Sequence, residues 1–304
     1  MSNSNSFDTN VYDMRMMPKH SESIQPQNTS YSISRCQQRI QKTKTTKNWI
    51  QVLEVLQATR DYDKSRILHS LLDKREHIVV KLGDSNLKNE FSYGKKFKGI
   101  KGFIKFDCFF ECDDNYLEHP SKNRNYLCKN IGTSMQVIVM PYYQLGSIKV
   151  FEWNKENKHV LHSCMKQACL SVLCAFSMKK LIHGDFHAGN VLLNATTTKK
   201  IVYKLRDVED IEVVTHGYQT IVMDFENTTE YNDDTMYDKI TGLNNFYYDL
   251  KKFFTLIVFF VPTLDKKTIY QVEKVINTCV DGSDHPLKLL ERNFLERIDE
   301  IDFI

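Results

Sequence analysis

The sequence lacks the features that mark several large classes of protein. Its eight cysteines include no Cys-x-x-Cys pair, and their spacing fits no common zinc pattern. We therefore expect reduced, buried thiols in an intracellular protein without a secretory leader. The longest apolar run, residues 253–262, is far shorter than the ~20 residues that cross a bilayer. It predicts a buried helix, with no membrane-spanning segment and no membrane partner.

Blocks of like charge are also missing. The 41 basic and 38 acidic side chains are interspersed and give a net charge of +3, which predicts no direct contact with nucleic acid. The chain does have size and apolar content. Its 304 residues, 41% of them hydrophobic, suffice for one large domain or for two lobes around a shared cleft.

Polar residues dominate the beginning of the chain. Residues 1–45 are rich in Ser, Asn, Gln, Thr and Lys and show little apolar periodicity, so they cannot bury enough surface to offset the entropy lost on ordering. We predict a disordered arm over 1–45 and a folded domain over 46–304.

Apolar periodicity divides this domain into a first part rich in strands and a second part rich in helices, which indicates an α+β fold. Leucine and isoleucine recur mostly at helical spacing in residues 49–72, and this predicts one or two helices before the first strand. Other helices are predicted over 85–97 and 159–178 and from 244 onward, and strands over 77–82, 102–112, 135–143, 190–194, 200–205, 211–215 and 219–225.

The stretch LIHGDFHAGNVLLN, residues 181–194, carries Asp185 and Asn190 between two apolar runs, and Asp224 follows a further apolar strand. Each carboxylate alone is explained equally well by a turn or a cap. Together, one Asp could orient and deprotonate an attacking hydroxyl, while the other Asp and the Asn hold Mg²⁺ against nucleotide phosphates. The set favours phosphoryl transfer from ATP.

Two upstream residues extend this set. Lys81 lies on an apolar strand and could pair with the α and β phosphates, and Glu90 on the next helix could be its ion-pair partner. The alternative for both is a solvated surface charge, which Lys88 beside Glu90 makes plausible. Lys81 fits burial better, because three apolar residues precede it.

The segment VIVMPYYQLGS is typical of a link between two lobes. It predicts a first lobe over about 46–140, a hinge over about 141–146 and a second lobe over about 147–304. Met140 would lie at the back of a nucleotide site. The carbonyl of Pro141 would face adenine, and the amide of Tyr143 would donate to its ring. The alternative is an edge strand that ends at Pro141.

On these residues, over about 78–254, the chain resembles the eukaryotic-type protein kinases and, among them, the haspin-like kinases. Haspin-like catalytic loops carry His where most protein kinases have Lys, followed by a variable residue, Gly and Asn. Here His187 begins that pattern and Asn190 ends it. These kinases also insert a β-hairpin before the metal-binding Asp. Residues 199–225 occupy that place, so that Asp224 follows Asn190 by 34 positions.

The resemblance implies a bilobal protein-kinase fold and transfer of the γ-phosphoryl group of ATP, with Mg²⁺, to Ser or Thr of a protein substrate. A histone tail is the substrate that the family suggests, and the nucleus or cytoplasm is the compartment. By matching positions, Asp185 is the catalytic base. Asn190 and Asp224 are the metal ligands, and Lys81 with Glu90 positions the phosphates.

Two further positions match the family. His187 replaces a lysine that contacts the γ-phosphate, and it either donates a hydrogen bond there or only braces the loop. Asp249 matches a helix aspartate that holds the backbone of the catalytic loop. Its alternative is an ordinary acid near a helix N-terminus.

The chain departs from the kinase pattern in its first lobe and after Asp224. No glycine occurs between Trp49 and Lys81, although backbone amides that cover phosphates normally depend on glycine. Phe225 and Glu226 follow Asp224, and no Ala-Pro-Glu motif occurs downstream. The missing glycines leave open a pseudokinase that serves as an interaction module. A second alternative is a small-molecule kinase of the aminoglycoside or choline type, which HGDFHAGN also resembles in its His.

Overall fold

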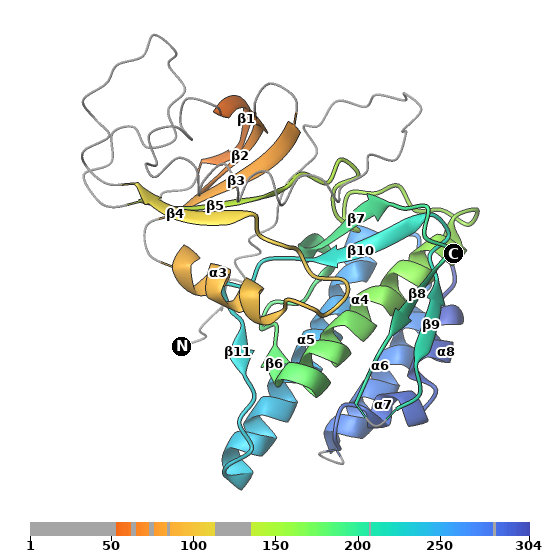
Figure 1. Cartoon of the computed structure of the whole chain (residues 1–304). Helices are drawn as coiled ribbons and strands as arrows, with labels where there is room; N and C mark the ends of the chain where they lie inside the picture. The colour runs from red at the N-terminus through yellow and green to blue at the C-terminus, as the bar shows by residue number, and fades with distance from the viewer. Residues whose placement is uncertain are drawn as a thin grey trace, which may run out of the picture.

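The computed structural model describes residues 53–61, 65–72, 76–83, 86–112, 135–206, 208–281 and 284–304, and the arm predicted over 1–45 lies outside them. The protein has a mixed α+β structure. A five-stranded sheet with one helix beneath it lies next to a larger part built mainly from helices (Figure 1). We call the described residues of 53–141 the sheet region and those of 142–304 the helical region.

The sheet region is antiparallel throughout, with the strand order β1-β2-β3-β5-β4. Strands β3 and β5 are central and apolar, and Val137, Ile138 and Val139 are fully buried. Helix α3 contacts β5. The elements are β1 (Leu53–Asp61), β2 (Ser65–Leu72), β3 (Glu76–Gly83), α3 (Leu87–Lys96), β4 (Cys108–Cys112) and β5 (Met135–Pro141).

Within the described residues the helices predicted over 49–72 are wrong, because 53–61 and 65–72 form the antiparallel strands β1 and β2. In a strand, residues that are two apart share a face, so the apolar residues of this stretch also fit β structure. Strand β2 pairs with β3 along its whole length, from Ser65 opposite Gly83 to Leu72 opposite Glu76. This non-local pairing overrides the local spacing.

The strand predicted over 102–112 is shorter than expected. Only β4 is regular, whereas Phe103 forms an isolated bridge with Val222 and the amide of Ile104 donates to the Val222 carbonyl at 2.9 Å. These residues pair with the helical region instead of extending β4. The segment therefore connects the two regions.

The helical region contains the remaining predicted elements. Three two-stranded sheets pair β7 with β10, β6 with β11 and β8 with β9. The elements are α4 (Lys158–Lys179), β6 (Leu181–Ile182), the 3₁₀ helix η3 (Ala188–Asn190), β7 (Val191–Ala195), β8 (Lys200–Tyr203), β9 (Ile211–Val214), β10 (Tyr218–Val222), β11 (Thr229–Glu230), α5 (Met236–Phe260), α6 (Lys266–Asp281), α7 (Lys288–Glu291) and α8 (Phe294–Asp299).

Helix α4 is the core of this region. Strands β8 and β9 lie along it, and α8 also contacts it (Figure 1). By length and composition α4 could cross a membrane, but 89% of its most apolar window is buried inside the protein. It is therefore a core helix. The five cysteines whose side chains are described, three of them on α4, are free and buried: Cys108, Cys164, Cys169, Cys174 and Cys279.

The apolar run at residues 253–262 forms the last turns of α5, which ends at Phe260. As predicted, much of it is buried. Phe253, Phe254 and Ile257 are fully buried, whereas Phe259 is 74% exposed. The buried side of α5 faces the segment between β6 and β7, since α5 contacts both β6 and η3. The candidate active site lies at this contact between α5 and the segment from β6 to β7.

Candidate active site

The segment between β6 and η3, residues 183–187, lies against the middle of α5, where Asp249 is located. Gly184 has a φ of +81°, and a Cβ at this position would lie 2.0 Å from the carbonyl oxygen of Asn227. Both the backbone conformation and the close approach require glycine. The chain can therefore turn here and direct Asp185 away from the core.

Asp249 on α5 holds the backbone of this loop. Its carboxylate accepts hydrogen bonds from the amide of Gly184 at 2.7 Å and from the amide of Phe186 at 3.2 Å. The side chain is buried, and burial raises its pKa even though both amides favour the ionised form. The prediction that Asp249 binds the loop backbone is confirmed, and its role as an ordinary helix acid is wrong.

His183 joins the loop to the segment that follows β10. Its Nε2 lies 2.9 Å from the Met223 carbonyl oxygen, and its Nδ1 accepts the amide of Asp185 at 3.2 Å. The amide of Met223 in turn donates to the carbonyl of Asn190 at 2.9 Å. The position of Asp224, the residue after Met223, is thus fixed relative to the loop. Sequence reasoning gave His183 no role.

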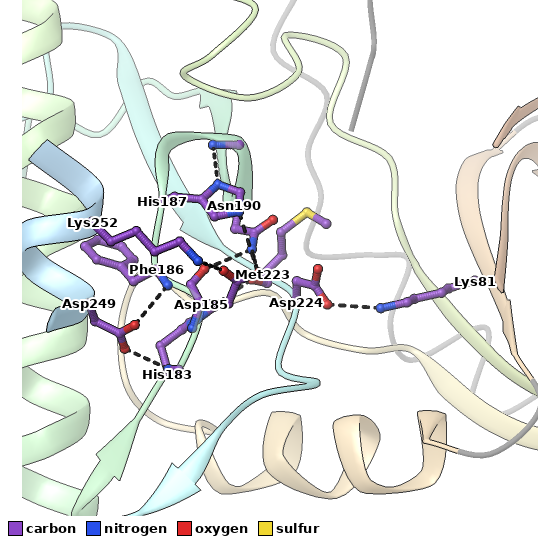
Figure 2. A network of polar contacts seen from close by, with 12 residues as sticks. Lys81, His183, Asp185, Phe186, His187, Asn190, Met223, Asp224, Asp249 and Lys252 are labelled. Atoms are coloured by element: carbon purple, nitrogen blue, oxygen red, sulfur yellow. Dashed lines mark hydrogen bonds and ion pairs between the residues drawn. The ribbon is translucent and has the colours of Figure 1, made fainter. Parts of the chain in front are cut away.

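The Asp185 carboxylate is surrounded by donors (Figure 2). Asn190 Nδ2 lies 3.3 Å from its Oδ2, His187 Nε2 lies 3.6 Å from the same oxygen, and Lys252 Nζ pairs with its Oδ1. Burial acts to raise the pKa of Asp185, but the hydrogen bonds from His187 and Lys252 outweigh it and hold the pKa well below its usual range. The carboxylate is ionised and, at 22% exposure, can be reached by another molecule.

His187 makes the contacts of a residue that braces the loop. Its Nδ1 accepts the amide of Gly189 at 3.0 Å, while its Nε2 faces Asp185. Because Nδ1 accepts this bond, the ring proton belongs on Nε2. Both ring nitrogens are therefore directed at the chain's own groups, one in η3 and one in the loop.

Asn190 combines a satisfied amide with an unsatisfied carbonyl. Its Nδ2 donates to the backbone carbonyl of Asp185 at 3.0 Å, whereas its Oδ1 is buried and has no hydrogen-bond partner among the described residues. A buried acceptor without a partner lowers stability by about 1–3 kcal/mol. A bound cation would supply the missing partner.

Asp224 has a φ of 69°, a left-handed conformation that non-glycine residues adopt at a cost of about 1–3 kcal/mol and that is common at functional sites. Its Oδ1 lies 3.0 Å from Lys81 Nζ. Lys81 also pairs with Glu90 Oε2 at 2.8 Å. The predicted ion pair between Lys81 and Glu90 is present, and both residues are buried rather than solvated.

Burial also acts on the pKa of Glu90. It raises the pKa of this carboxyl to about 7, and the neighbouring Asp224 acts in the same direction, whereas Lys81 opposes both. The buried Glu90 carboxyl therefore takes up a proton more readily than an exposed one. The position of Lys81 depends on this equilibrium, since only the ionised carboxylate pairs fully with it.

The residues predicted to contact adenine lie along β5 and just beyond it. Met140 pairs with Val79, two residues before Lys81 on β3, and Pro141 pairs with Ile78. Met140 is buried, and burial raises the pKa of the Tyr143 hydroxyl. The strand ends at Pro141, as the alternative reading has it, but the edge position of that reading is wrong, because β5 lies between β3 and β4.

Lys252 belongs to the site but was not predicted. It lies three residues after Asp249 on α5, and residues at this spacing share a face of a helix. Once Asp249 is taken to face the loop, this spacing could have identified Lys252. Figure 2 shows it approaching Asp185 from α5, whereas Lys81 approaches Asp224 from the opposite side.

The structure therefore brings most of the predicted site residues into two adjoining groups. Among the described residues no cluster of three or more His, Cys, Asp or Glu side chains forms a metal centre. The carboxylate of Asp224 and the unpartnered oxygen of Asn190 are of the ligand type that Mg²⁺ prefers, and the Mg²⁺ site stays a prediction. No model of a protein family matches the chain, and a comparison with curated proteins gave no match.

Proposed function

We propose that this protein is a Ser/Thr protein kinase of the haspin-like type, which uses ATP and Mg²⁺. One observation carries the proposal. Lys81 from β3 contacts both Glu90 from α3 and Asp224 after β10, beside a loop that presents an ionised Asp185 and an unpartnered Asn190 oxygen. Four distant segments thus supply the polar groups that phosphoryl transfer requires.

The two regions would correspond to the two lobes of a kinase. The sheet region would be the first lobe, residues 141–146 the hinge, and the rest of the helical region the second lobe. The hairpin of β8 and β9, between β7 and β10 in the chain, supports the haspin-like type over a small-molecule kinase.

Each residue would have a defined part in the reaction. Asp224 and Asn190 would hold Mg²⁺, which neutralises charge on the phosphates when bound. Lys81 would exchange its contact with Asp224 for nucleotide phosphate oxygens, while Glu90 keeps the ammonium group in place. Asp185 would accept a hydrogen bond from the substrate hydroxyl and take its proton.

The low pKa of Asp185 is compatible with this part. In a loose transition state the hydroxyl loses its proton late, so the base mainly orients the attacking oxygen. A carboxylate that stays ionised is always available as the acceptor. Its partners His187 and Lys252 fix its orientation.

A second candidate, an interaction module without activity, is favoured by the sequence that joins β1 to β2. Residues 62–64, Tyr-Asp-Lys, lie outside the described residues and contain no glycine. A kinase would need backbone amides there to cover the phosphates.

The decisive experiment measures transfer from labelled ATP with Mg²⁺ to basic proteins, including histones, and to choline and an aminoglycoside. The wild-type protein is expected to label a protein, and Asp185→Asn to reduce the rate by about 10²–10⁴-fold. Asp234→Asn, a change of the same type at an exposed residue, serves as the control.

Three other outcomes have clear meanings. Equal background transfer by the wild type and Asp185→Asn would contradict the proposal that the protein is an enzyme. If Mg·ATP also failed to raise the melting temperature, the interaction module would be preferred. Labelling of choline or the aminoglycoside alone would favour a small-molecule kinase.

A further inference from the structure

Lys252 makes an ion pair whose position is more informative than its strength. Its side chain is 28% exposed and that of its partner Asp185 is 22% exposed. Ion pairs with this much exposure contribute only about 0–1 kcal/mol to stability. The pair nevertheless places a cation against the carboxylate that we identify as the base.

Of the described groups that donate to Asp185, Lys252 is the one with further N–H donors available. The ring nitrogens of His187 face Gly189 and Asp185. An ammonium group has three N–H donors, and among the described residues the ion pair of Lys252 is with Asp185 alone. Two donors can therefore reach a further anion beside Asp185.

Lys81 cannot fill the same place. It comes from the sheet region and contacts Asp224 on the side opposite to Lys252 (Figure 2). The two lysines thus flank the pair of carboxylates from two directions. An anionic group positioned between Asp185 and Asp224 would have a cation on each side. The phosphoryl group in transit is such an anion, because its charge is spread over three oxygens.

We propose that Lys252 is a catalytic residue whose ammonium group binds the oxygens of the phosphoryl group in transit while it orients Asp185. The inference rests on the proposed kinase function. The acceptor hydroxyl oxygen forms a bond to the γ-phosphorus, and the bond from that phosphorus to the bridging oxygen breaks. The bridging oxygen leaves with the electron pair on ADP, and the hydroxyl proton passes to Asp185. Lys252 stays protonated throughout.

The test compares Lys252→Met, which removes the charge but keeps most of the stem, with Lys252→Arg and with Lys251→Met as the matched control. Lys252→Met is expected to lower kcat by about 10²–10³-fold, with the KM for ATP changed by less than about threefold, because the lost contact forms only in the transition state. Lys252→Arg should restore part of kcat, and Lys251→Met should leave it unchanged.

A binding measurement separates catalysis from folding. Aluminium fluoride with Mg·ADP imitates the phosphoryl group in transit, so it should tighten ADP binding to the wild type and to Lys251→Met but not to Lys252→Met. Binding of Mg·ADP alone should be equal in all three, which also shows that the variant is folded.

Full kcat in Lys252→Met, or undiminished tightening by aluminium fluoride, would overturn the assignment of Lys252 and leave the kinase proposal intact. A variant that loses kcat and Mg·ADP binding together, without recovery in Lys252→Arg, would show a merely structural role. A wild-type protein that transfers no phosphate would instead overturn the kinase proposal, and this inference with it.

Discussion

The two regions of the molecule hold their polar residues in different ways. In the helical region, the loop that carries Asp185 is fixed through its backbone: Asp249 accepts two of its amides, and His183 joins it to Met223. In the sheet region, Lys81 is held by charge, through ion pairs with Glu90 and, across the junction, with Asp224.

This difference separates a rigid half of the site from an adjustable half. Hydrogen bonds to backbone amides keep their geometry whatever binds nearby. An ion pair can be exchanged for another anion, and it weakens when its acid takes up a proton. The helical region is therefore preorganised, whereas the sheet region can respond to nucleotide and to pH.

The largest expected effect comes from breaking the apolar contact between the regions. Phe225 is fully buried and packs on Phe97 at 4.5 Å and on Phe106 at 5.5 Å between ring centroids. Phe225→Ala should lower the free energy of unfolding by about 3–5 kcal/mol. The lost contacts join the residues that follow α3 to the helical region, so hydrogen exchange should accelerate more in α3 than in α4.

A matched control is Phe254→Ala, a phenylalanine of equal burial that packs on Phe253 and Phe294 within the helical region. Its loss of stability should be similar, without preferential exchange in α3. If both variants gave the same exchange pattern, the two regions would form one cooperative unit and the contrast between them would fail.

The next effect concerns the rigid half. Asp249→Asn keeps the shape but replaces one acceptor oxygen with an N–H group that faces a backbone N–H. Because hydrogen bonds to a charged group contribute about 1.5–3 kcal/mol each, denaturant unfolding should show a loss of about 2–4 kcal/mol. The exposed Asp234 provides the control, and Asp234→Asn should stay within about 0.5 kcal/mol of the wild type. A loss no larger in Asp249→Asn than in this control would show that the amides find other acceptors.

The smallest effect concerns the adjustable half and depends on pH. The pKa of Glu90 is raised from 4.5 to about 7, chiefly by burial, so between these values the folded protein binds more protons than the unfolded chain. The free energy of unfolding should therefore fall as pH rises from 4.5 to about 7, by at most about 3 kcal/mol, and this contribution should level off above it.

The comparison with Glu90→Gln isolates that contribution in thermal melts without nucleotide. The variant should show a smaller decline in melting temperature over this pH range, while Glu296→Gln, at an exposed site on α8, should behave like the wild type. An unchanged slope in Glu90→Gln would assign the pH dependence to other groups.

The parts of the site that lie close together in the chain could be predicted from the sequence. The spacing of Asp185 and Asn190 within one loop predicted their proximity, and the strand-then-helix order predicted the pair of Lys81 and Glu90; both contacts are present. Such predictions succeed because a short loop, or two consecutive elements, allows few arrangements.

Predictions failed where distant segments decide the structure. Residues 53–61 and 65–72 form strands because β1 pairs with β2 and β2 with β3, which the local spacing of leucines cannot reveal. Lys252 reaches a residue 67 positions earlier in the chain, and a lysine on an amphipathic helix is normally solvated. Only the orientation of α5, set by packing against the loop, distinguishes it from its neighbour Lys251.

The burial of α4 has a consequence for the synthesis of the protein. Within the helical region, the elements that contact α4 all follow it in the chain, and α8 is the last of them. Just after α8, the carbonyl oxygen of Ile301 lies 2.6 Å from Nε2 of His162 on α4. More than a hundred residues separate the end of α4 from α8. At the usual rates of translation the ribosome takes on the order of ten seconds to make them. During that time a helix apolar enough to be taken for a membrane anchor is incompletely covered, so the nascent chain is a natural client for chaperones that bind apolar segments.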